Sequence, residues 1–438
     1  MRILSAVNAI GKSAVGVFLV LSLVNVASAN PFNHFAWEEI NDGSGITWDP
    51  RAGLQAVKLK GHFYVMGGRA PVPFPPRTFG ESVFYNDVWR STDSGETWEI
   101  LTDSFGAPWQ ARAYFQAVTR GRYMYVIGGQ DSEAVPNFLY PECDDILAGL
   151  PPVTGSCPEF LLNSTFFSDV WRSRNGVDWQ RMTEDANWAP GLNGEKGRAG
   201  LMAVVHHGWI YVMGGSVNDD FAIIGPAGPS RQYFNDVYKS RNGRDWIKVT
   251  DQAPWPARAG GVLVSRGRYM YLLGGEDGFV CEPGRPDRCP PYYNDVWKST
   301  NGKNWELVTD NAGWSPRPGH QCEVLLGRII CFGGFGLPPQ QPPPAAPNYS
   351  ASNPMDIWAS YDGKNWVELG GSASPPWNAA GPEDIKYDFA AFPVYFPNGK
   401  FRPSIYTFGG DRETFDPFDP LATEKVDSDV WRFSFERN

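Results

Sequence analysis

A basic residue recurs six times along the chain, and in five copies it is an arginine that stands sixteen residues before a Gly-Gly pair. The six residues are Arg51, Arg112, Arg198, Arg258, Arg317 and Lys386. A guanidinium group binds a carboxylate or a phosphate through two parallel hydrogen bonds. If the fold gathers these residues at one opening, they would hold a small acid or an acidic sugar. The alternative is a structural role that ties neighbouring loops through backbone carbonyls, because a feature present in every repeat commonly serves the repeat.

Three residues that depart from the repeat are candidates for proton transfer. Four copies have a glycine two residues after the basic residue, whereas Tyr114 and Asp388 take its place in the second and sixth copies. His320 stands with Glu323 on an otherwise apolar stretch of the fifth copy. A tyrosine, a histidine and an aspartate around one opening can transfer protons beside a carboxylate that arginines hold. The alternative is that each is an ordinary hydrogen-bonded residue of a central channel.

These residues belong to a repeat with three further marks. A Gly-Gly pair ends an apolar run, an Asp-aliphatic-aromatic triplet follows, and the first five copies then carry a second Trp. The triplets begin at Asp87, Asp169, Asp236, Asp295, Asp356 and Asp429, and the later tryptophans are Trp98, Trp179, Trp246, Trp305 and Trp366. A long period with four short strands per copy is typical of a propeller blade.

The spacing of these marks predicts the strands. Each basic residue precedes strand one, the Gly-Gly pair ends strand two, and the triplet lies in strand three. A hairpin turn such as Asn175-Gly176 joins strands three and four, because Asn-Gly tolerates positive φ at both turn positions. The last copy lacks the second Trp, whereas the chain begins with an isolated strand around Trp37 to Ile40. We therefore predict an all-β, six-bladed propeller with four antiparallel strands per blade, whose ring the N-terminal strand closes by completing blade six.

The topology also predicts which end of the ring binds a ligand. The turns that join strands one and two, and strands three and four, are short, whereas the loops between strands two and three are long in every copy. Long loops on a rigid scaffold are where binding residues usually lie. The basic residues begin strand one, so we expect them at the channel mouth on this long-loop face. Aromatic residues such as Tyr85 and Tyr293 crowd the same loops, and they would either stack on sugar rings or cover the ends of the blades.

The pattern resembles kelch repeats over about residues 35–438, on the basis of the Arg, the Gly-Gly pair, the triplet and the later Trp. It is also similar to the central domain of galactose oxidase, although the copper ligands of that enzyme have no match here. Exported six-bladed kelch proteins include sialic-acid mutarotases. The resemblance therefore implies recognition of a glycan or a small acidic sugar on the long-loop face, with mutarotase, epimerase or lyase activity on a sugar acid if the chain is an enzyme. The second hypothesis is a non-catalytic module that binds a protein at the cell surface or in the extracellular space, since kelch propellers serve both purposes.

The N-terminus has the pattern of a signal peptide. Arg2 and Lys12 supply positive charge, residues 15–26 form a short apolar core, and Ala27-Ser28-Ala29 is a small-residue cleavage site. We predict a signal peptide over residues 1–29 and a propeller over residues 30–438. The mature protein would be secreted or periplasmic, without a membrane span.

The six cysteines fit an oxidising compartment. We predict local disulfides within the pairs Cys143 and Cys157, Cys281 and Cys289, and Cys322 and Cys331. The first two pairs flank loop insertions, whereas the third falls on the two arms of one predicted hairpin. The alternative is that these residues are free buried thiols.

Composition limits the partners that the chain would attract. The net charge of −10 and the pI of about 5.1 argue against a nucleic acid or an anionic membrane, because neither attracts an acidic surface. The five histidines form no spaced ligand set, so we expect neither a metal nor another cofactor.

Overall fold

The structure is a computed structural model, and contacts divide the chain into two units, Met1–Pro31 and Phe32–Asn438. All that follows concerns the second unit. The residues that the structure describes are 35–45, 48–73, 81–102, 106–136, 159–188, 197–217, 224–225, 228–229, 232–278, 291–335, 356–370, 386–412 and 425–435.

Six antiparallel sheets of four strands form the blades of a β-propeller, as predicted. Blade one consists of β2 (Gln55–Leu59), β3 (His62–Met66), β6 (Val88–Ser91) and β7 (Glu99–Ile100). Blade two consists of β8 (Gln116–Arg120), β9 (Tyr123–Ile127), β12 (Val170–Ser173) and β13 (Trp179–Thr183). Blade three consists of β14 (Met202–His206), β15 (Trp209–Met213), β20 (Val237–Ser240) and β21 (Trp246–Thr250). Blade four consists of β22 (Val262–Arg266), β23 (Tyr269–Glu276), β24 (Tyr292–Ser299) and β25 (Trp305–Thr309). Blade five consists of β26 (Gln321–Leu325), β27 (Arg328–Phe332), β28 (Ile357–Ser360) and β29 (Trp366–Leu369). Blade six consists of β30 (Ala390–Val394), β31 (Ser404–Asp411), β32 (Val426–Phe435) and β1 (Phe35–Asn41).

Four two-stranded sheets extend from blades one to three in the described part of the chain: β4 (Arg69–Pro71) with β5 (Ser82–Phe84), β10 (Gln130–Pro136) with β11 (Phe160–Phe166), β16 (Ser216–Val217) with β19 (Gln232–Tyr233), and β17 (Ile224–Gly225) with β18 (Gly228–Pro229). Among the described residues, one 3-10 turn, η6 (Pro397–Gly399), lies between β30 and β31. Within the described residues, no helix is long and apolar enough to cross a membrane.

The turn between strands three and four shows how the repeat builds a blade. In blade three, the Ser240 hydroxyl accepts a hydrogen bond from the backbone of Gly243, which has a φ of 77°. The indole of Trp246 then donates to the carbonyl of Gly243 over 3.1 Å. A side chain at Gly243 would be strained by the positive φ and would meet the ring of Tyr125 in blade two. In the first five repeats, the Gly and the later Trp therefore fix both the turn and its contact with the preceding blade.

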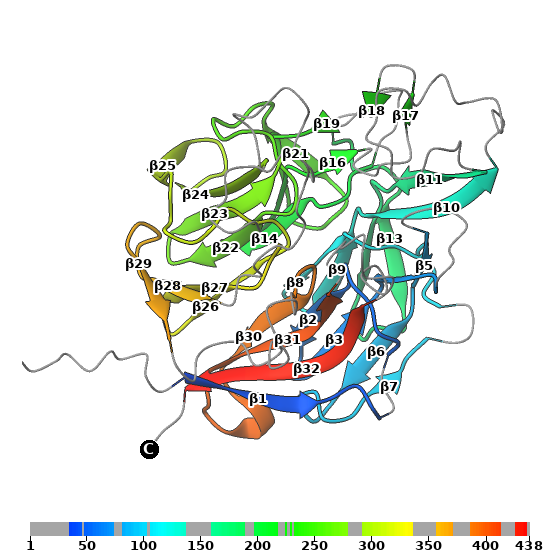
Figure 1. Cartoon of the computed structure of the whole chain (residues 1–438), viewed down its shortest axis with the longest axis horizontal. Coiled ribbons are helices and arrows are strands. Elements are labelled where there is room, and N and C mark those ends of the chain that lie inside the picture. Colours follow the sequence, from blue (N-terminus) through cyan, green and yellow to red (C-terminus); the bar gives the residue numbers. More distant parts are fainter. Residues whose placement is uncertain are drawn as a thin grey trace, which may run out of the picture. The chain divides into compact units, whose positions relative to one another are not determined.

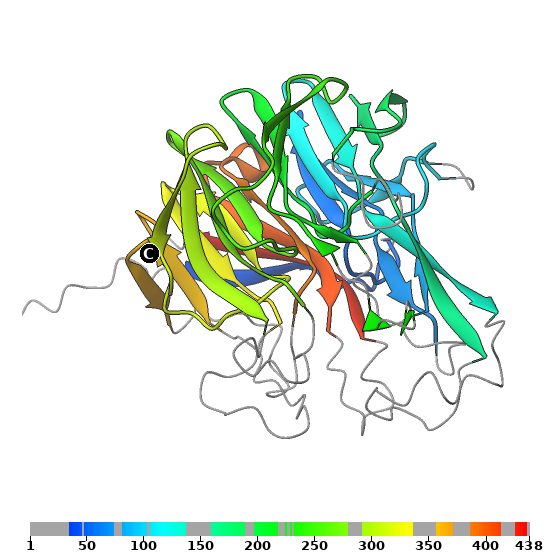
Figure 2. The same cartoon turned by 90° about the horizontal axis from the view of Figure 1, so that it is seen from above.

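The N-terminal strand closes the ring. β1 pairs antiparallel with β32, with Trp37 opposite Phe433, and so supplies the fourth strand of blade six. Figure 1 shows β1 in blue beside β32 in red, and Figure 2 shows the same pair from above. The closure leaves no blade of the ring with only three strands.

One of the three predicted disulfides is confirmed. Cys322 on β26 and Cys331 on β27 are opposite each other in the register and form a disulfide with an S–S distance of 2.06 Å. The other two predicted pairs, Cys143 with Cys157 and Cys281 with Cys289, lie outside the described residues.

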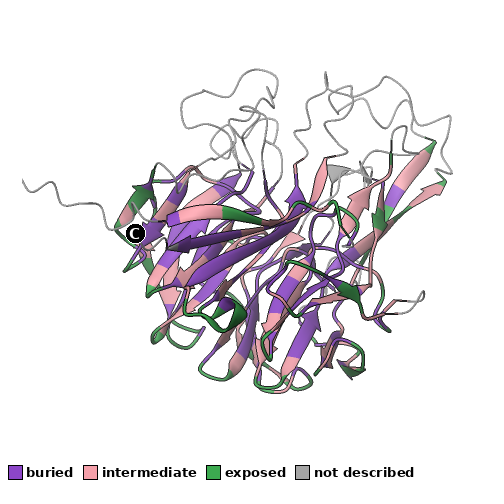
Figure 3. Cartoon of the chain, turned by 90° about the horizontal axis from the view of Figure 1, so that it is seen from below, coloured by how far each residue is buried: buried purple, intermediate pink, exposed green. Residues whose placement is uncertain are grey.

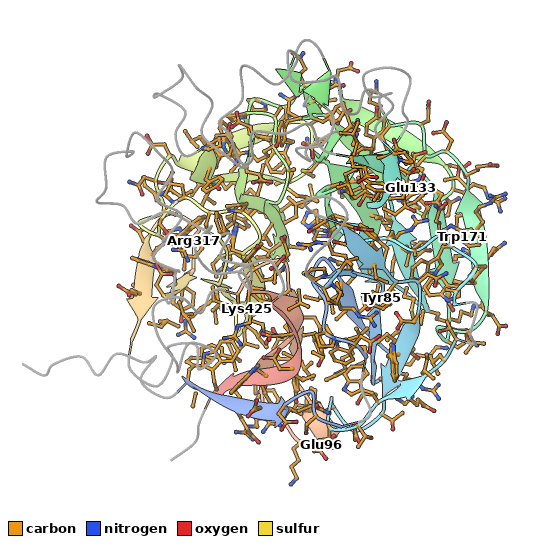
Figure 4. All side chains as sticks on the ribbon, turned by 45° about the vertical axis from the view of Figure 1, so that its right-hand side comes forward. Tyr85, Glu96, Glu133, Trp171, Arg317 and Lys425 are labelled. Atoms are coloured by element: carbon orange, nitrogen blue, oxygen red, sulfur yellow. A yellow bond between two sulfur atoms is a disulfide. The ribbon has the colours of Figure 1, made fainter. Side chains whose placement is uncertain are left out.

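The first strand of every blade faces the axis. Neighbouring first strands contact each other all the way round, in the order β2, β8, β14, β22, β26 and β30. They line a cavity of about 680 Å³. Figure 4 shows Trp171 and Glu96 near the outer edge of the ring, with Tyr85 and Lys425 closer to its centre.

Candidate functional site

The five repeated arginines are buried and paired with the repeated aspartates. In blade three, the Arg198 guanidinium donates from Nη1 to Oδ1 of Asp236 over 2.5 Å and from Nη2 to Oδ2 over 2.9 Å. Nη1 also donates to the carbonyl of Gly214 over 3.1 Å. The same bidentate pair recurs between Arg51 and Asp87, Arg112 and Asp169, Arg258 and Asp295, and Arg317 and Asp356. Each arginine is at most 3% exposed.

The backbone of each arginine fastens one blade to the next. The Arg198 N–H donates to the carbonyl of Phe167 in blade two, and the Arg198 carbonyl accepts from Gly129 of the same blade. An aromatic ring covers the guanidinium: Phe234 lies 3.7 Å from Arg198, and Tyr85 lies 3.7 Å from Arg51. We call this unit the Arg–Asp latch. The contacts are those of the structural alternative, so the ligand role of the arginines stays a prediction to which the geometry adds no support.

Blade six builds the latch from different residues. Lys386 Nζ donates to Asp429 Oδ1 over 2.6 Å and to Asp427 Oδ2 over 3.0 Å. Asp427 occupies the position of the aromatic cover in blades one to four, two residues before the triplet aspartate. An ammonium group offers no flat face for stacking, so a second carboxylate suits it better than a ring. Burial raises the pKa of Asp429, and the charge of Lys386 opposes that shift.

A closed circle of backbone hydrogen bonds surrounds the axis at the start of the first strands. Each member donates its N–H to the carbonyl of the equivalent residue in the preceding blade, with distances between 2.8 and 3.3 Å. Its six members, which we call the axial ring, are Gly53, Tyr114, Gly200, Gly260, Gly319 and Asp388. All six have positive φ, between 48° and 66°. Glycine adopts this conformation freely, whereas other residues are strained there, so Tyr114 and Asp388 are exceptions that need an explanation.

Tyr114 belongs to a network that joins blades one, two and six. Its ring lies against Gly53, and its hydroxyl accepts a hydrogen bond from Arg69 Nε over 2.6 Å. Arg69 Nη2 pairs in turn with Asp411 Oδ2 over 2.7 Å. Burial raises the pKa of Tyr114 well above its usual value, an effect that the carboxylates of Asp388 and Asp411 reinforce. The phenol therefore keeps its proton across the physiological range.

The sequence interpretation missed Arg69 and Asp411. Both directly follow a Gly-Gly pair. In five blades, the residue at this position forms an isolated β-bridge with the residue that precedes the axial-ring member. That position holds Arg69, Gln130, Ser216, Glu276, Phe335 and Asp411 in the six copies. Its variation beside an invariant Gly-Gly was a usable signal, because only residues that differ between blades can make an asymmetric site. We call Tyr114, Asp388, Arg69 and Asp411 the axial cluster.

His320 does not join this cluster. It is 1% exposed and fills a position between blades, where its ring packs 5.4 Å from Trp314 and lies over Gly274. Phe115 and Leu201 lie over the equivalent glycines in other blades. Burial, together with the charge of Arg317, lowers the pKa of His320 to about 3. The structure thus brings Tyr114 and Asp388 to one opening, whereas His320 occupies a core position, and its proton-transfer role stays a prediction.

Glu323 lines the axial cavity on β26, at a position where the other blades have Val or Phe. Burial raises its pKa from the usual 4.5 to about 8. The folded chain therefore holds the proton of the Glu323 carboxyl group more tightly than the unfolded chain does. The stability that Glu323 contributes falls as the pH rises from about 5 to 8.

We expect Glu323→Gln to remove this dependence, because a neutral amide replaces the carboxyl group. The variant should match the parent at pH 5 and exceed its free energy of unfolding at pH 8 by roughly 1–3 kcal/mol, a value reduced for water in the channel. Urea unfolding at the two pH values measures the difference. The exposed Glu368→Gln serves as the control, and an equal pH dependence in Glu323→Gln and the parent would disprove the prediction.

Comparisons with known proteins give the fold and little more. No model of a known protein family matches the chain, and no curated protein matches it. Among solved structures, the chain is similar to YjhT, with a TM-score of 0.53 and 16% sequence identity over 88% of this chain and 95% of that chain. An identity this low shows a shared fold and does not assign an activity.

Proposed function

We propose that the chain is a kelch-type propeller that binds a neutral glycan at the axial cluster, on its long-loop face. The observation that carries the proposal is the pair of side chains, Tyr114 and Asp388, held at positive φ where four blades use glycine. A left-handed conformation costs such residues of order 1 kcal/mol, and strain of this kind concentrates at functional sites. The kelch resemblance and the likeness to YjhT are compatible with this proposal.

The charges of the cluster favour hydroxyl groups over an acid as the ligand. The one guanidinium group of the cluster, that of Arg69, is already paired with Asp411, and the carboxylates of Asp388 and Asp411 both act on the phenol of Tyr114. Carboxylates accept hydrogen bonds from sugar hydroxyls and repel a sugar acid. The cationic mouth that a sugar acid needs would require the Arg–Asp latches to open. Of the two ligand classes that the sequence left open, we therefore favour the neutral glycan, whether or not the site also catalyses a reaction.

We also propose that the protein is exported. The signal-peptide pattern over residues 1–29 supports this, and the disulfide between Cys322 and Cys331 is compatible with an oxidising compartment.

Tyr114→Gly tests the glycan site without a change of fold, because glycine is what four blades carry at this position. We expect the variant to lose ligand-induced stabilisation, about 2.7 kcal/mol for the parent at a hundredfold excess over Kd. Its own free energy of unfolding should change by no more than about 1 kcal/mol, since relief of strain offsets the lost contacts. Thermal shifts with neutral oligosaccharides and with sugar acids measure both quantities.

His207→Gly is the matched control, because His207 also has a positive φ, of 45°, but lies exposed in the turn between β14 and β15. It should leave ligand binding unchanged. A shift with sugar acids alone would contradict the neutral-glycan assignment. No shift with any sugar would favour the protein-interaction module instead, and a pull-down with the long-loop face intact would then identify its partner.

A further inference from the structure

The turns between strands one and two form a basic surface at the end of the ring opposite the long loops. No Asp or Glu occurs in residues 58–62, 119–123, 205–209, 265–269, 324–328 or 394–404, which hold all six turns and are all described. The basic residues there are Lys58, Lys60, Arg120, Arg122, Arg266, Arg268, Arg328, Lys400 and Arg402. We call this surface the turn face. Figure 3 shows exposed turns along the lower edge of the blades.

The whole-chain charge of −10 hides this segregation. Lys60, Arg122, Arg268 and Lys400 are exposed, and none of them forms an ion pair with a carboxylate in the described part of the chain. The turns between strands three and four add both signs: Arg174, Arg241, Arg244, Lys303 and Lys364 accompany Asp93, Glu96, Asp178, Asp245 and Asp362. The positive potential is therefore strongest near the axis and weaker toward the rim.

Hydrogen bonds between blades hold the turns in place. Arg120 Nε donates to the carbonyl of Gly208 over 2.6 Å, and Arg266 Nε donates to the carbonyl of Gly327 over 2.6 Å. Lys60 Nζ donates to the carbonyl of Arg174 over 3.0 Å. Each bond joins turns of adjacent blades, so these basic side chains are preorganised and a partner would not have to order them.

Blade six adds two exposed phenylalanines to the turn face. Its turn, residues 395–403, is longer than the others and presents Phe396 and Phe401, which are 59% and 54% exposed. The two rings lie 5.3 Å apart, with Lys400 between them in the sequence. The Asn398 backbone N–H donates to Ser94 Oγ of blade one over 3.2 Å, and this anchors the turn. Leu326 in the adjacent turn of blade five is also exposed, at 40%.

We propose that the turn face binds an anionic lipid surface. The basic residues are spread over five blades around the axis, so a flat anionic surface can meet them together, whereas a nucleic acid duplex would reach only a line of them. Exposed phenyl rings flanked by Lys and Arg are suited to the boundary between headgroups and acyl chains. Our expectation from the net charge, which argued against an anionic membrane, considered the chain as a whole, whereas binding to a surface depends on local charge.

The test is flotation of the full mature protein with two kinds of vesicle. One consists of phosphatidylcholine alone, and the other also contains about 30–40% phosphatidylglycerol. We expect binding to the anionic vesicles only, with weaker binding at high salt. The triple variant Arg122→Glu, Arg268→Glu and Lys400→Glu should weaken binding by at least about a hundredfold, since each basic residue near such a surface strengthens binding roughly fivefold and each added carboxylate is repelled. Phe396→Ser with Phe401→Ser should weaken binding by at least about tenfold while leaving the salt dependence in place.

The matched control reverses three basic residues away from the turn face, Arg181, Lys248 and Lys425, all to Glu. It gives the same net charge and should keep vesicle binding within about twofold of the parent. Equal loss in both triple variants would overturn the proposal, because net charge alone would then explain binding. Binding of duplex DNA as tight as that of vesicles, with no effect of the Phe396 and Phe401 substitutions, would overturn the lipid assignment in favour of a general polyanion site. No binding to anionic vesicles at low salt would overturn it outright.

Discussion

Replacing Arg198 by Met is expected to cost about 3–5 kcal/mol of stability, because it leaves the carboxylate of Asp236 buried without a counter-ion. Asp236 is 4% exposed, and both of its oxygens accept hydrogen bonds from Arg198. Methionine fills part of the volume and can still pack on Phe234, so the loss measures the charge pair rather than a cavity. The backbone bonds of residue 198 to blade two remain. Guanidinium chloride unfolding followed by tryptophan fluorescence measures the change.

Blade three is the best place for the paired control. In all five other blades, the triplet aspartate also accepts from the indole N–H of the triplet Trp, as Asp295 does from Trp297 over 2.7 Å. Blade three has Tyr238 in that position, so removal of the carboxylate leaves no indole unpaired. The double variant Arg198→Met with Asp236→Leu should therefore recover most of the lost stability, since an apolar pair of similar volume can replace a buried ion pair.

The two variants also separate the two roles of the repeated arginines. If the double variant is as unstable as the single one, the unpaired carboxylate is not the cause of the loss. If Arg198→Met retains the stability of the parent but loses binding of a sugar acid, the ligand role that we first predicted for the arginines is correct and the latch is secondary. Loss of stability with unchanged glycan binding is what we expect.

The repeat pattern predicted the fold because each of its marks has a local physical cause. The Gly of the Asn-Gly turns needs a positive φ, and the later Trp needs the carbonyl of that Gly. The orphan strand at the N-terminus and the truncated sixth copy predicted the closure by β1, which the pairing with β32 confirms. The Cys322–Cys331 disulfide was also predictable, since both cysteines fall on one hairpin at opposed positions.

The candidate site was less predictable because its contacts cross between blades. Arg69 and Asp411 are 342 residues apart and meet only after the ring has closed. Spacing likewise shows that an Arg and an Asp recur in every copy, but their pairing within a blade depends on the return of strand three beside strand two. The basic turn face was hidden for a third reason: a sum over the chain cancels charges that the fold separates.

Deleting residues 30–45 is expected to destabilise the whole ring by more than about 5 kcal/mol, and not blade six alone. Phe35 is 1% exposed and stacks on Phe433 at 4.9 Å, so its loss alone is worth about 3–5 kcal/mol. Trp37 packs on Phe332 of blade five at 5.6 Å, so the strand also seals the joint between blades five and six. Removal of β1 would leave the edge of β32 exposed and free to pair with other chains.

The number of unfolding transitions distinguishes a closed ring from a row of independent blades. A single transition at a lower denaturant concentration, seen alike by tryptophan fluorescence and near-ultraviolet circular dichroism, is the expected result. Phe35→Ala should move the same transition part of the way, whereas Glu39→Ala, exposed on the same strand, should change stability by less than about 0.5 kcal/mol. An unchanged unfolding curve after the deletion would show that β1 is dispensable. A separate early transition of small amplitude would show that blade six unfolds alone. In that case the five Arg–Asp latches would suffice to hold the other blades together.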